Sequence, residues 1–368
     1  MTYQLPITAH LLRLLKKIKT HLLPTFGEMT GLFTYRKFSL SDTPPLTGKV
    51  AVLTGGQTGI GREITTQLLV HGIRKIFILG RSKQKFSEAL EYWRSRRYTI
   101  EYDDKSRLSF VQCDLADIRS VKDSADQIMK ATDRLDIVIC NAGLGIANQY
   151  KLSPQGIEAT FATDVVGHQV LVTLLLPFLK KTAVDYKTDT RIIVTSSSLH
   201  SLCRHLDLNL LKSPTPTRPA YYDGIWRYGR SKLGSLLFTR ELSRRLLADP
   251  DPASKNIYVN AFFPGNIATE QADVWKKYLG GLLGWLVKKF LSVFGQSTED
   301  AAASAMYLAA SKDISDGAGT RGQYFVPIAK KRRTSSTAED MILARSLWNW
   351  IDRQATETLG DEWPDSRQ

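Results

Sequence analysis

A glycine-rich turn between an apolar run and a helical pattern constrains this chain most strongly. Residues 50–53 are all apolar, as expected for a short buried parallel strand. The turn at 54–61 follows at once, and from Arg62 apolar residues recur at helical spacing. A helix that begins beside a strand end presents free N–H groups and a positive dipole end to a phosphate. The sequence therefore predicts a dinucleotide-binding unit, with a glycine-rich turn that binds nothing as the alternative.

Three glycines of this turn have separate expected tasks. Gly55 permits the tight turn, Gly59 lets the backbone approach a phosphate without a Cβ, and Gly61 lets the helix lie close to the strand. The spacing is G-x-x-x-G-x-G rather than the G-x-G-x-x-G of other dinucleotide folds. We also count Ile60, between the last two glycines, among the residues expected at the pyrophosphate.

The end of the second expected strand indicates which dinucleotide would bind. Residues 75–79 are followed by Gly80, Arg81 and Ser82, with lysines at 83 and 85. An acidic residue here would accept hydrogen bonds from the ribose of NAD, whereas Arg81 suits a 2′-phosphate. We therefore predict NADP(H), with Arg81 and Ser82 in the cofactor site. The alternative is that Arg81 caps a strand and the lysines are solvated.

Two further strands are expected at 108–113 and 135–140, and residues just after parallel strands face the ligand crevice. Asp114 suits the adenine amine, or it caps a helix that begins near Ile118. The Asn141 side chain is suited to hydrogen-bond between neighbouring strands. The other residues that we expect at the cofactor because they follow these strands are Leu115, Ala142 and Gly143.

A serine-ended strand and a Y-x-x-x-K spacing supply the expected chemistry. Residues 191–195 run into Ser196, Ser197 and Ser198, and Tyr228 and Lys232 then lie one turn apart on a predicted helix. A free phenol, with a pKa of about 10, is a poor base at neutral pH, and a nearby ammonium lowers that pKa. A serine hydroxyl holds the substrate oxygen. This pattern predicts proton transfer by Tyr228 while a hydride moves to or from nicotinamide.

With these residues in place, the chain resembles the short-chain dehydrogenase/reductase family over about residues 46–330, and within it the retinol dehydrogenase-like and fungal tailoring-reductase branches. The motifs that carry the resemblance are TGGQTGIG at 54–61, CNAG at 140–143, TSSS at 195–198, YGRSK at 228–232 and PGNIAT at 264–269. The resemblance implies an α/β fold: a Rossmann-type doubly wound parallel sheet of about seven strands in a single domain. It also implies a homodimer or homotetramer.

The resemblance assigns roles to individual residues. Ser197 would contact the substrate, Tyr228 would transfer the proton, and Lys232 would also bind the nicotinamide ribose. The segment expected to cover the nicotinamide amide contains Pro264, Gly265, Ile267 and Thr269.

The chain departs from the family pattern at Asp164, where the family has asparagine in a context like F-x-x-N-x-x-G-H. In the family this residue supports a water relay to the lysine. An aspartate keeps the backbone carbonyl and accepts hydrogen bonds but does not donate through an amide. An ionised Asp164 would raise the pKa of Lys232. We expect Asp164 to support the relay as a near-isostere, so the rate of turnover is the property that the substitution affects.

The expected domain organisation is an N-terminal helical extension at 1–46, a catalytic domain at 47–328 with a lid at about 270–296, and a C-terminal linker and helix at 329–368. Within the last part, the basic run 330–333 is interpreted as a solvated linker, with nuclear localisation as the alternative. Residues 10–19 alternate leucines with basic residues, which fits a helix packed on the domain or an interfacial membrane helix.

The expected lid and one long loop bear on the substrate. An apolar helical stripe at 275–294 fits a wall for a large apolar substrate, or an ordinary amphipathic helix. Between Ser197 and Tyr228 a proline-rich loop borders the expected site. Candidate substrate contacts there, which are equally plausible as structural side chains, are His200, Tyr221, Tyr222 and Trp226.

Composition limits the partners. The net charge of +14 is spread along the chain without a nucleic-acid motif, so we expect cofactor phosphates and a membrane surface rather than DNA or RNA. A basic surface without a partner is the alternative. The cysteines at 113, 140 and 203 lack metal-ligand spacing, so we expect no metal, no disulfide and a reducing compartment. The predicted location is cytoplasmic, with peripheral membrane contact left open.

Taken together, these patterns predict an NADP(H)-dependent oxidoreductase that interconverts a carbonyl and an alcohol on an apolar small molecule. Two alternatives stay open. One is a cofactor-binding protein with little turnover and a regulatory role, and the other is an enzyme that uses the phenol for isomerisation or dehydration without net redox chemistry.

Overall fold

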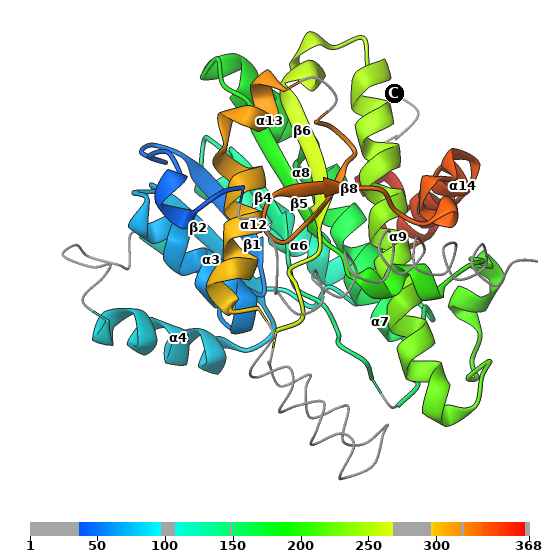
Figure 1. Ribbon diagram of the computed structural model, residues 1–368. Coiled ribbons are helices and arrows are strands. Elements are labelled where there is room, and N and C mark those ends of the chain that lie inside the picture. Colours follow the sequence, from blue (N-terminus) through cyan, green and yellow to red (C-terminus); the bar gives the residue numbers. More distant parts are fainter. Residues whose placement is uncertain (1–36, 97–106, 148, 268–295, 318–319, 365–368) are drawn as a thin grey trace, which may run out of the picture.

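Parallel strand pairing organises the molecule (Figure 1). The computed structural model describes residues 37–96, 107–147, 149–267, 296–317 and 320–364, and the predictions for the N-terminal helix, most of the lid and Thr269 lie outside them. Eight strands form one sheet in the order β3-β2-β1-β4-β5-β6-β7-β8. They are β1 (Val50–Thr54), β2 (Lys75–Gly80), β3 (Leu108–Gln112), β4 (Ile137–Cys140), β5 (Thr190–Thr195), β6 (Ile257–Phe262), β7 (Tyr324–Val326) and β8 (Lys330–Arg332).

Helices cover both faces of this sheet. They are α3 (Gly59–Val70), α4 (Lys83–Ser95), α6 (Ile118–Ala131), α7 (Ala159–Phe161), α8 (Gly167–Asp185), α9 (Ala220–Ala248), α12 (Thr298–Ala310), α13 (Lys312–Asp316) and α14 (Met341–Leu359). The π-helical segment η3 (Ala162–Val166) joins α7 to α8. Short 3₁₀ turns are η2 (Leu40–Asp42), η4 (Ser198–Leu202), η5 (Leu208–Lys212), η6 (Pro252–Asn256), η7 (Ser336–Glu339) and η8 (Gly360–Glu362).

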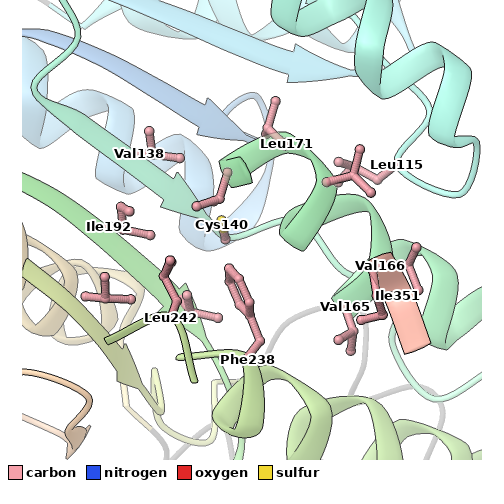
Figure 2. Packing of buried hydrophobic residues seen from close by; sticks show 14 of the residues in the cluster. Leu115, Val138, Cys140, Val165, Val166, Leu171, Ile192, Phe238, Leu242 and Ile351 are labelled. Carbon is pink, nitrogen blue, oxygen red and sulfur yellow. The ribbon is translucent and has the colours of Figure 1, made fainter. Parts of the chain in front are cut away.

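The apolar run of β1 shows why both faces need covering. All five of its residues are buried, and because side chains alternate, Val50 and Val52 enter one core while Ala51 and Leu53 enter the other. The first core lies between the sheet and α6, α8 and α9, and Figure 2 shows its packing. The second lies under α3, α4 and α12. The predicted doubly wound α/β architecture is confirmed.

The interpretation of residues 330–333 as a linker is wrong. Residues 330–332 form β8, which pairs antiparallel with β7 at the edge of the sheet. The lysine side chains of β8 stay exposed, because an edge strand needs only its backbone for pairing. A run of cations carries no apolar alternation, so the pattern of residues there does not predict a strand.

The most apolar helical stretch is a core helix of the sheet. Residues Ala159–Asp185 have a mean hydropathy of 1.5 over their best window, long and apolar enough to cross a membrane. However, 83% of that window is buried inside the fold. Burial against α6, β5 and β6 therefore accounts for its composition.

The C-terminal helix α14 packs against α9. Leu347 and Ile351 are fully buried, and the Trp348 ring stacks on Phe238 of α9 with 6.0 Å between centroids. In contrast, Ile342 on the same helix is 82% exposed. One face of α14 thus completes the core beside α9.

This packing predicts that Leu347→Ala lowers the free energy of unfolding by about 2–5 kcal/mol, because it leaves a cavity against α9. The matched change Ile342→Ala on the exposed face should alter it by less than about 0.5 kcal/mol. Urea unfolding followed by circular dichroism measures both. Equal effects would show that α14 does not pack as described.

Candidate active site

The order of the strands locates the site. The chain runs outward from β1 through β2 to β3 and then returns to β4 on the other side of β1. In open α/β sheets, ligands bind outside the carboxyl ends of the strands where this order reverses. Here that point lies between the end of β1 at Thr54 and the end of β4 at Cys140.

The glycine turn has the geometry of a phosphate cradle. Gly55 and Gly59 have φ angles of +68° and +51°, which glycine adopts without strain. Among the described residues, a Cβ built on Gly59 would meet no atom within 4 Å, so the backbone there is open to a ligand. The N-cap residue of α3, Thr58, makes no side-chain cap hydrogen bond in the described structure. The first turn of α3 therefore keeps donors for an anion.

Gly61 is required by packing. A Cβ on Gly61 would lie 2.2 Å from the carbonyl oxygen of Gly55, so only glycine lets α3 approach the turn this closely. Gln57 was missed by the sequence reasoning. Its side-chain amide contacts Gly80 at the end of β2, where a Cβ would come within 2.3 Å of it. Within the described chain the Gln57 Oε1 atom is buried without a hydrogen-bond partner, so the turn holds a spare acceptor beside β2.

Asn141 ties the ends of β1 and β4 together. Its Nδ2 donates to the Thr54 carbonyl at 3.1 Å, and its backbone N–H donates to the Thr54 hydroxyl at 2.9 Å. The N–H of Ala142 donates to the same hydroxyl at 2.9 Å. Gly143 follows, and a Cβ there would lie 3.1 Å from Asp164 and 3.2 Å from Lys232. The CNAG segment therefore adjoins both the glycine turn and the predicted catalytic residues.

The remaining cofactor candidates lie at neighbouring strand ends. Arg81 is exposed just after β2, and Ser82 caps α4 by accepting from the N–H of Lys85 at 3.2 Å. The cap of α6 is Asp117, which accepts from the N–H of Arg119, so the expectation that Asp114 caps this helix is wrong. Asp114 instead accepts from the N–H of Ala116 at 3.0 Å in a local turn. Asp117 rather than Asp114 is the cap because an N-cap residue directly precedes the first helical residue.

The other described cofactor candidates lie in two segments, one after β3 and one after β6. The Leu115 carbonyl lies where a Cβ on Gly167 would come within 2.1 Å, so α8 begins tightly against it. After β6, Pro264 leads into Gly265, whose φ is +99°. Ile267 bridges in parallel to Gln296, whose Oε1 accepts from the N–H of Asn266 at 2.7 Å. This segment follows the carboxyl end of β6, so it lies on the same side of the sheet as the ends of β1 and β4.

The predicted catalytic side chains meet between β5 and α9. The Lys232 ammonium lies 5.3 Å from the centroid of the Tyr228 ring. The Ser197 hydroxyl lowers the pKa of the Tyr228 phenol, and it accepts from the N–H of Leu199 at 3.3 Å as the cap of η4. Ser196 donates to the Lys232 carbonyl at 2.9 Å, which fixes α9 against the end of β5. The fold thus gathers Ser197, Tyr228 and Lys232 in one place.

Asp164 joins this group as the partner of Lys232. Its carboxylate is 2.9 Å from the Lys232 Nζ, and it accepts from the Ser231 hydroxyl at 2.9 Å and from the Leu144 N–H at 2.8 Å. Asp164 and Lys232 are 2% and 4% exposed, so the pair is shielded from water. Burial raises the pKa of the Asp164 carboxyl, and these three donors oppose that shift by stabilising the carboxylate.

The pair changes the electrostatics of the phenol. Burial lowers the pKa of Lys232, but Asp164 and Tyr228 outweigh it, so the net pKa is raised and the ammonium persists. Burial raises the pKa of Tyr228, the Lys232 charge and the Ser197 hydrogen bond lower it, and Asp164 raises it. The aspartate therefore offsets part of the activation that Lys232 provides.

His168 connects the two halves of the site and was not expected from the sequence. Its Nε2 is 2.9 Å from the Thr54 hydroxyl, and its Nδ1 is 3.0 Å from the backbone oxygen of Asp164. Burial lowers the pKa of His168 to about 4, so the ring is neutral at neutral pH. It therefore positions the Asp164 main chain without adding a charge.

The residues predicted as substrate contacts have different positions in the structure. His200 is buried, with its Nδ1 2.7 Å from the Ser197 carbonyl and its Nε2 3.4 Å from the Ser335 N–H, so it supports Ser197. Tyr222 and Trp226 line a cavity of about 440 Å³ whose described wall does not include Tyr228. The side chain of Tyr221 lies outside the described structure. A larger cavity, of about 870 Å³ beside Arg191, is lined by none of the predicted site residues that the structure describes.

Comparison with known proteins agrees with this geometry. A family model described as short chain dehydrogenase matches residues 49–202. The Colletotrichum higginsianum protein "Short chain dehydrogenase/reductase dpchH" is 33% identical over 318 residues, covering 84% of this chain and 75% of that protein. Human "Retinol dehydrogenase 14" is 31% identical over 317 residues, covering 82% and 84%. The protein bli-4 of Neurospora crassa, named as mitochondrial, is 31% identical over 359 residues, covering 95% and 81%.

Solved structures share the fold. The Pseudomonas aeruginosa structure "RhlG/NADP active-site complex" matches with a TM-score of 0.55 and 23% identity, covering 77% of this chain and 96% of that one. The site and the relatives together define a nicotinamide-dependent oxidoreductase of the α/β class. The chain belongs to the short-chain dehydrogenase/reductase family.

The neutral His168 predicts acid sensitivity of the fold. Its folded pKa of about 4 lies below the ordinary value of 6.5, so the unfolded chain binds the extra proton and stability falls as the pH drops from about 6.5 to 4. Between pH 7 and 5 this loss amounts to about 2 kcal/mol. Urea unfolding at both pH values should show a smaller loss for His168→Gln than for the wild type. The same pH dependence in both proteins would contradict the assignment.

Proposed function

We propose that this protein interconverts a carbonyl and an alcohol on an apolar small molecule, with NADP(H) as the hydride carrier. One observation supports the proposal most strongly. Ser197, Tyr228 and Lys232 lie close together on the side of the sheet where the strands end, and the glycine turn lies on that side too. A hydride carrier in that turn would face a phenol with a charged neighbour, which is the arrangement that carbonyl reduction needs.

Each side chain has a defined task in this proposal. A bound nicotinamide would supply or accept the hydride. Ser197 orients and polarises the substrate oxygen, and Tyr228 donates a proton to it during reduction or takes one from the alcohol during oxidation. Lys232 stabilises the phenolate and would hold the nicotinamide ribose. Asp164 holds Lys232 in place and supports the proton relay.

The preference for NADP(H) rests on the end of β2. Residues 80–82 contain no carboxylate to accept from a ribose hydroxyl, and the exposed Arg81 suits a 2′-phosphate. The NADP complex of the Pseudomonas protein is consistent with this preference. We take reduction as the direction in the cell, because the NADPH pool is normally kept reduced.

The apolar substrate class rests on the loop after β4. Leu144 is held at Asp164 by its N–H, and residues 144–147 read Leu-Gly-Ile-Ala. These partly exposed side chains supply an apolar wall beside the reacting groups. A cytoplasmic location is part of the proposal, and tagged protein in cell fractions would separate it from the mitochondrial location in the name of bli-4.

A protein with little redox turnover is the second candidate, because the Asp164 carboxylate offsets the activating charge of Lys232. NADPH consumption in the presence of apolar ketones and aldehydes decides between the two. Consumption equal to the alcohol formed supports the reductase. Cofactor binding without consumption, or conversion of the substrate without loss of NADPH, would overturn it.

Arg81→Ala should weaken NADPH binding about tenfold or more, because it removes a charge-assisted contact to the 2′-phosphate. NADH binding should not change. Titration of nicotinamide fluorescence measures both affinities. Arg94→Ala is the control, since Arg94 is an exposed arginine on α4, the helix that follows Arg81 in the chain. An equal loss of NADPH and NADH affinity would exclude a 2′-phosphate role for Arg81.

Asp164→Asn should move the alkaline limb of the reduction rate to lower pH. The Asp164 charge raises the pKa of Tyr228, so its removal lowers that pKa, and the protonated phenol is lost at lower pH. The rate of NADPH oxidation as a function of pH measures the shift. A limb that stays in place would show that Asp164 does not act on Tyr228 through its charge.

A further inference from the structure

Four charged residues outside the proposed machinery are buried around the first half of α9. Glu158, Asp223, Arg227 and Arg230 are 0%, 3%, 1% and 1% exposed. Asp223, Arg227 and Arg230 lie on α9 itself, and Glu158 is the N-cap of α7. On a helix surface such residues would be solvated, so their complete burial needs an explanation.

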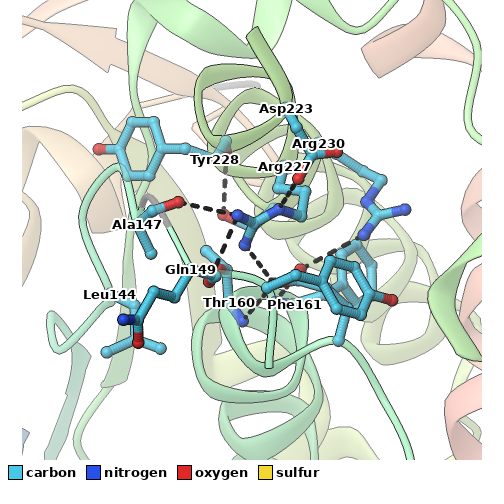
Figure 3. A network of polar contacts seen from close by, with 12 residues as sticks. Leu144, Ala147, Gln149, Thr160, Phe161, Asp223, Arg227, Tyr228 and Arg230 are labelled. Atoms are coloured by element: carbon cyan, nitrogen blue, oxygen red, sulfur yellow. Dashed lines mark hydrogen bonds and ion pairs between the residues drawn. The ribbon is translucent and has the colours of Figure 1, made fainter. Parts of the chain in front are cut away.

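Arg227 joins α9 to the loop after β4. Its Nε donates to Asp223 at 2.6 Å, and its Nη1 donates to Glu158 at 2.9 Å. Its Nη2 donates to the backbone carbonyl of Ala147 at 2.8 Å (Figure 3). The planar guanidinium thus fixes the loop, α7 and α9 relative to one another.

Glu158 is the centre of this network. It accepts from Arg227 at 2.9 Å and from Arg230 at 3.3 Å, and it also accepts from the N–H groups of Thr160 and Phe161 at 3.0 and 3.1 Å. The Glu158 N–H donates to the carbonyl of Leu211 at 2.8 Å. The Glu158 side chain therefore joins the start of α7 to Arg227 and Arg230 of α9, and its backbone joins the loop before α9.

Stability alone does not account for such a network. Each buried charge loses its hydration, and a well-packed apolar set of similar volume is often at least as stable. The two carboxylates and two guanidiniums balance, so the cluster carries no net charge. What ions add over apolar contacts is directional geometry.

The network flanks the proposed proton donor. Tyr228 lies between Arg227 and Arg230 in the chain, and in Figure 3 its ring points away from the network. The same two segments are joined a second time, because Asp164 after α7 bonds to Ser231 and Lys232 of α9. The loop after β4 is also held twice, by Arg227 at Ala147 and by Asp164 at Leu144.

We propose that Glu158 is a positioning residue for Tyr228. Through Arg227 and Arg230 it fixes the first half of α9 against α7 and the loop after β4, so that the phenol is held at Ser197. The inference rests on the proposed function for its catalytic consequence. Small displacements of a reacting group cost large factors in rate, so loss of the network should appear in kcat rather than in cofactor affinity.

The test uses the full chain with Glu158→Gln, which keeps the shape of the side chain and removes its charge. The matched control is Glu241→Gln. Glu241 is a fully buried glutamate further along α9 that is paired with Arg244 and Arg245, at 2.7 and 2.9 Å, and within the described structure it bonds to none of the proposed catalytic residues. Three quantities are measured: the unfolding midpoint in urea, kcat and KM for NADPH, and amide hydrogen exchange over residues 144–147 and 222–230.

Both variants should lose stability. Only Glu158→Gln should lower kcat, by about tenfold or more, with KM for NADPH unchanged and faster exchange in both segments. A comparable loss of kcat in both variants, or normal kcat and exchange in Glu158→Gln, would reduce the network to a structural role. If Glu158→Gln does not fold, Arg227→Lys takes its place, since it keeps the charge and loses the planar fork.

These readouts separate the inference from the proposed function. A wild-type protein that binds NADPH but reduces nothing would overturn the function. The exchange data would then decide alone whether Glu158 holds the Tyr228 segment, with unchanged exchange in Glu158→Gln as the contradicting result.

Discussion

The hydroxyl of Thr54 is the contact on which the rest of the site depends. It accepts from the N–H groups of Asn141 and Ala142 and pairs with His168, each at 2.9 Å. It thereby joins the end of β1, the end of β4 and the helix that carries Asp164. Because this hydroxyl is fully buried, each of its contacts is costly to lose. The residues proposed to bind the cofactor and those proposed to act on the substrate thus share one anchor.

Ion pairs on α9 hold the side chains that we propose react with the substrate. Lys232 is bound to Asp164 within the site, while Arg227 and Arg230 are bound to Glu158 behind it. Two parallel connections between the same segments resist rotation better than one. The cost is electrostatic, because a carboxylate beside Lys232 opposes the ionisation of Tyr228. In the proposed mechanism, Asp164 therefore affects both the position of Lys232 and the ionisation of Tyr228.

The sequence predicted what local patterns determine. Apolar runs predicted β1 to β5, but no strand was predicted at β6. The glycine turn and the Y-x-x-x-K spacing pointed to residues that the structure brings together at the carboxyl ends of the strands. The sequence-based predictions failed where contacts between distant parts of the chain determine the structure. The basic run of β8 has no strand pattern of its own, and β7 recruits it through backbone hydrogen bonds. In the sequence alone, nothing distinguishes Arg227, Arg230 and Glu158 from charged surface residues, because their ion pairs form only when α7 packs against α9. The contact between His168 and Thr54 likewise joins residues far apart in the chain.

The most direct test of this mechanism is a single-turnover experiment with Tyr228→Phe and the wild type, each saturated with NADPH and mixed with an apolar ketone or aldehyde. Absorbance at the nicotinamide band reports hydride transfer, and fluorescence titration checks that both proteins bind the cofactor equally. We predict that the wild type oxidises NADPH in step with alcohol formation and that Tyr228→Phe, although it binds NADPH normally, is slower by a factor of about 10²–10⁴. Hydride transfer at the wild-type rate in Tyr228→Phe would contradict the central claim that this phenol moves the proton.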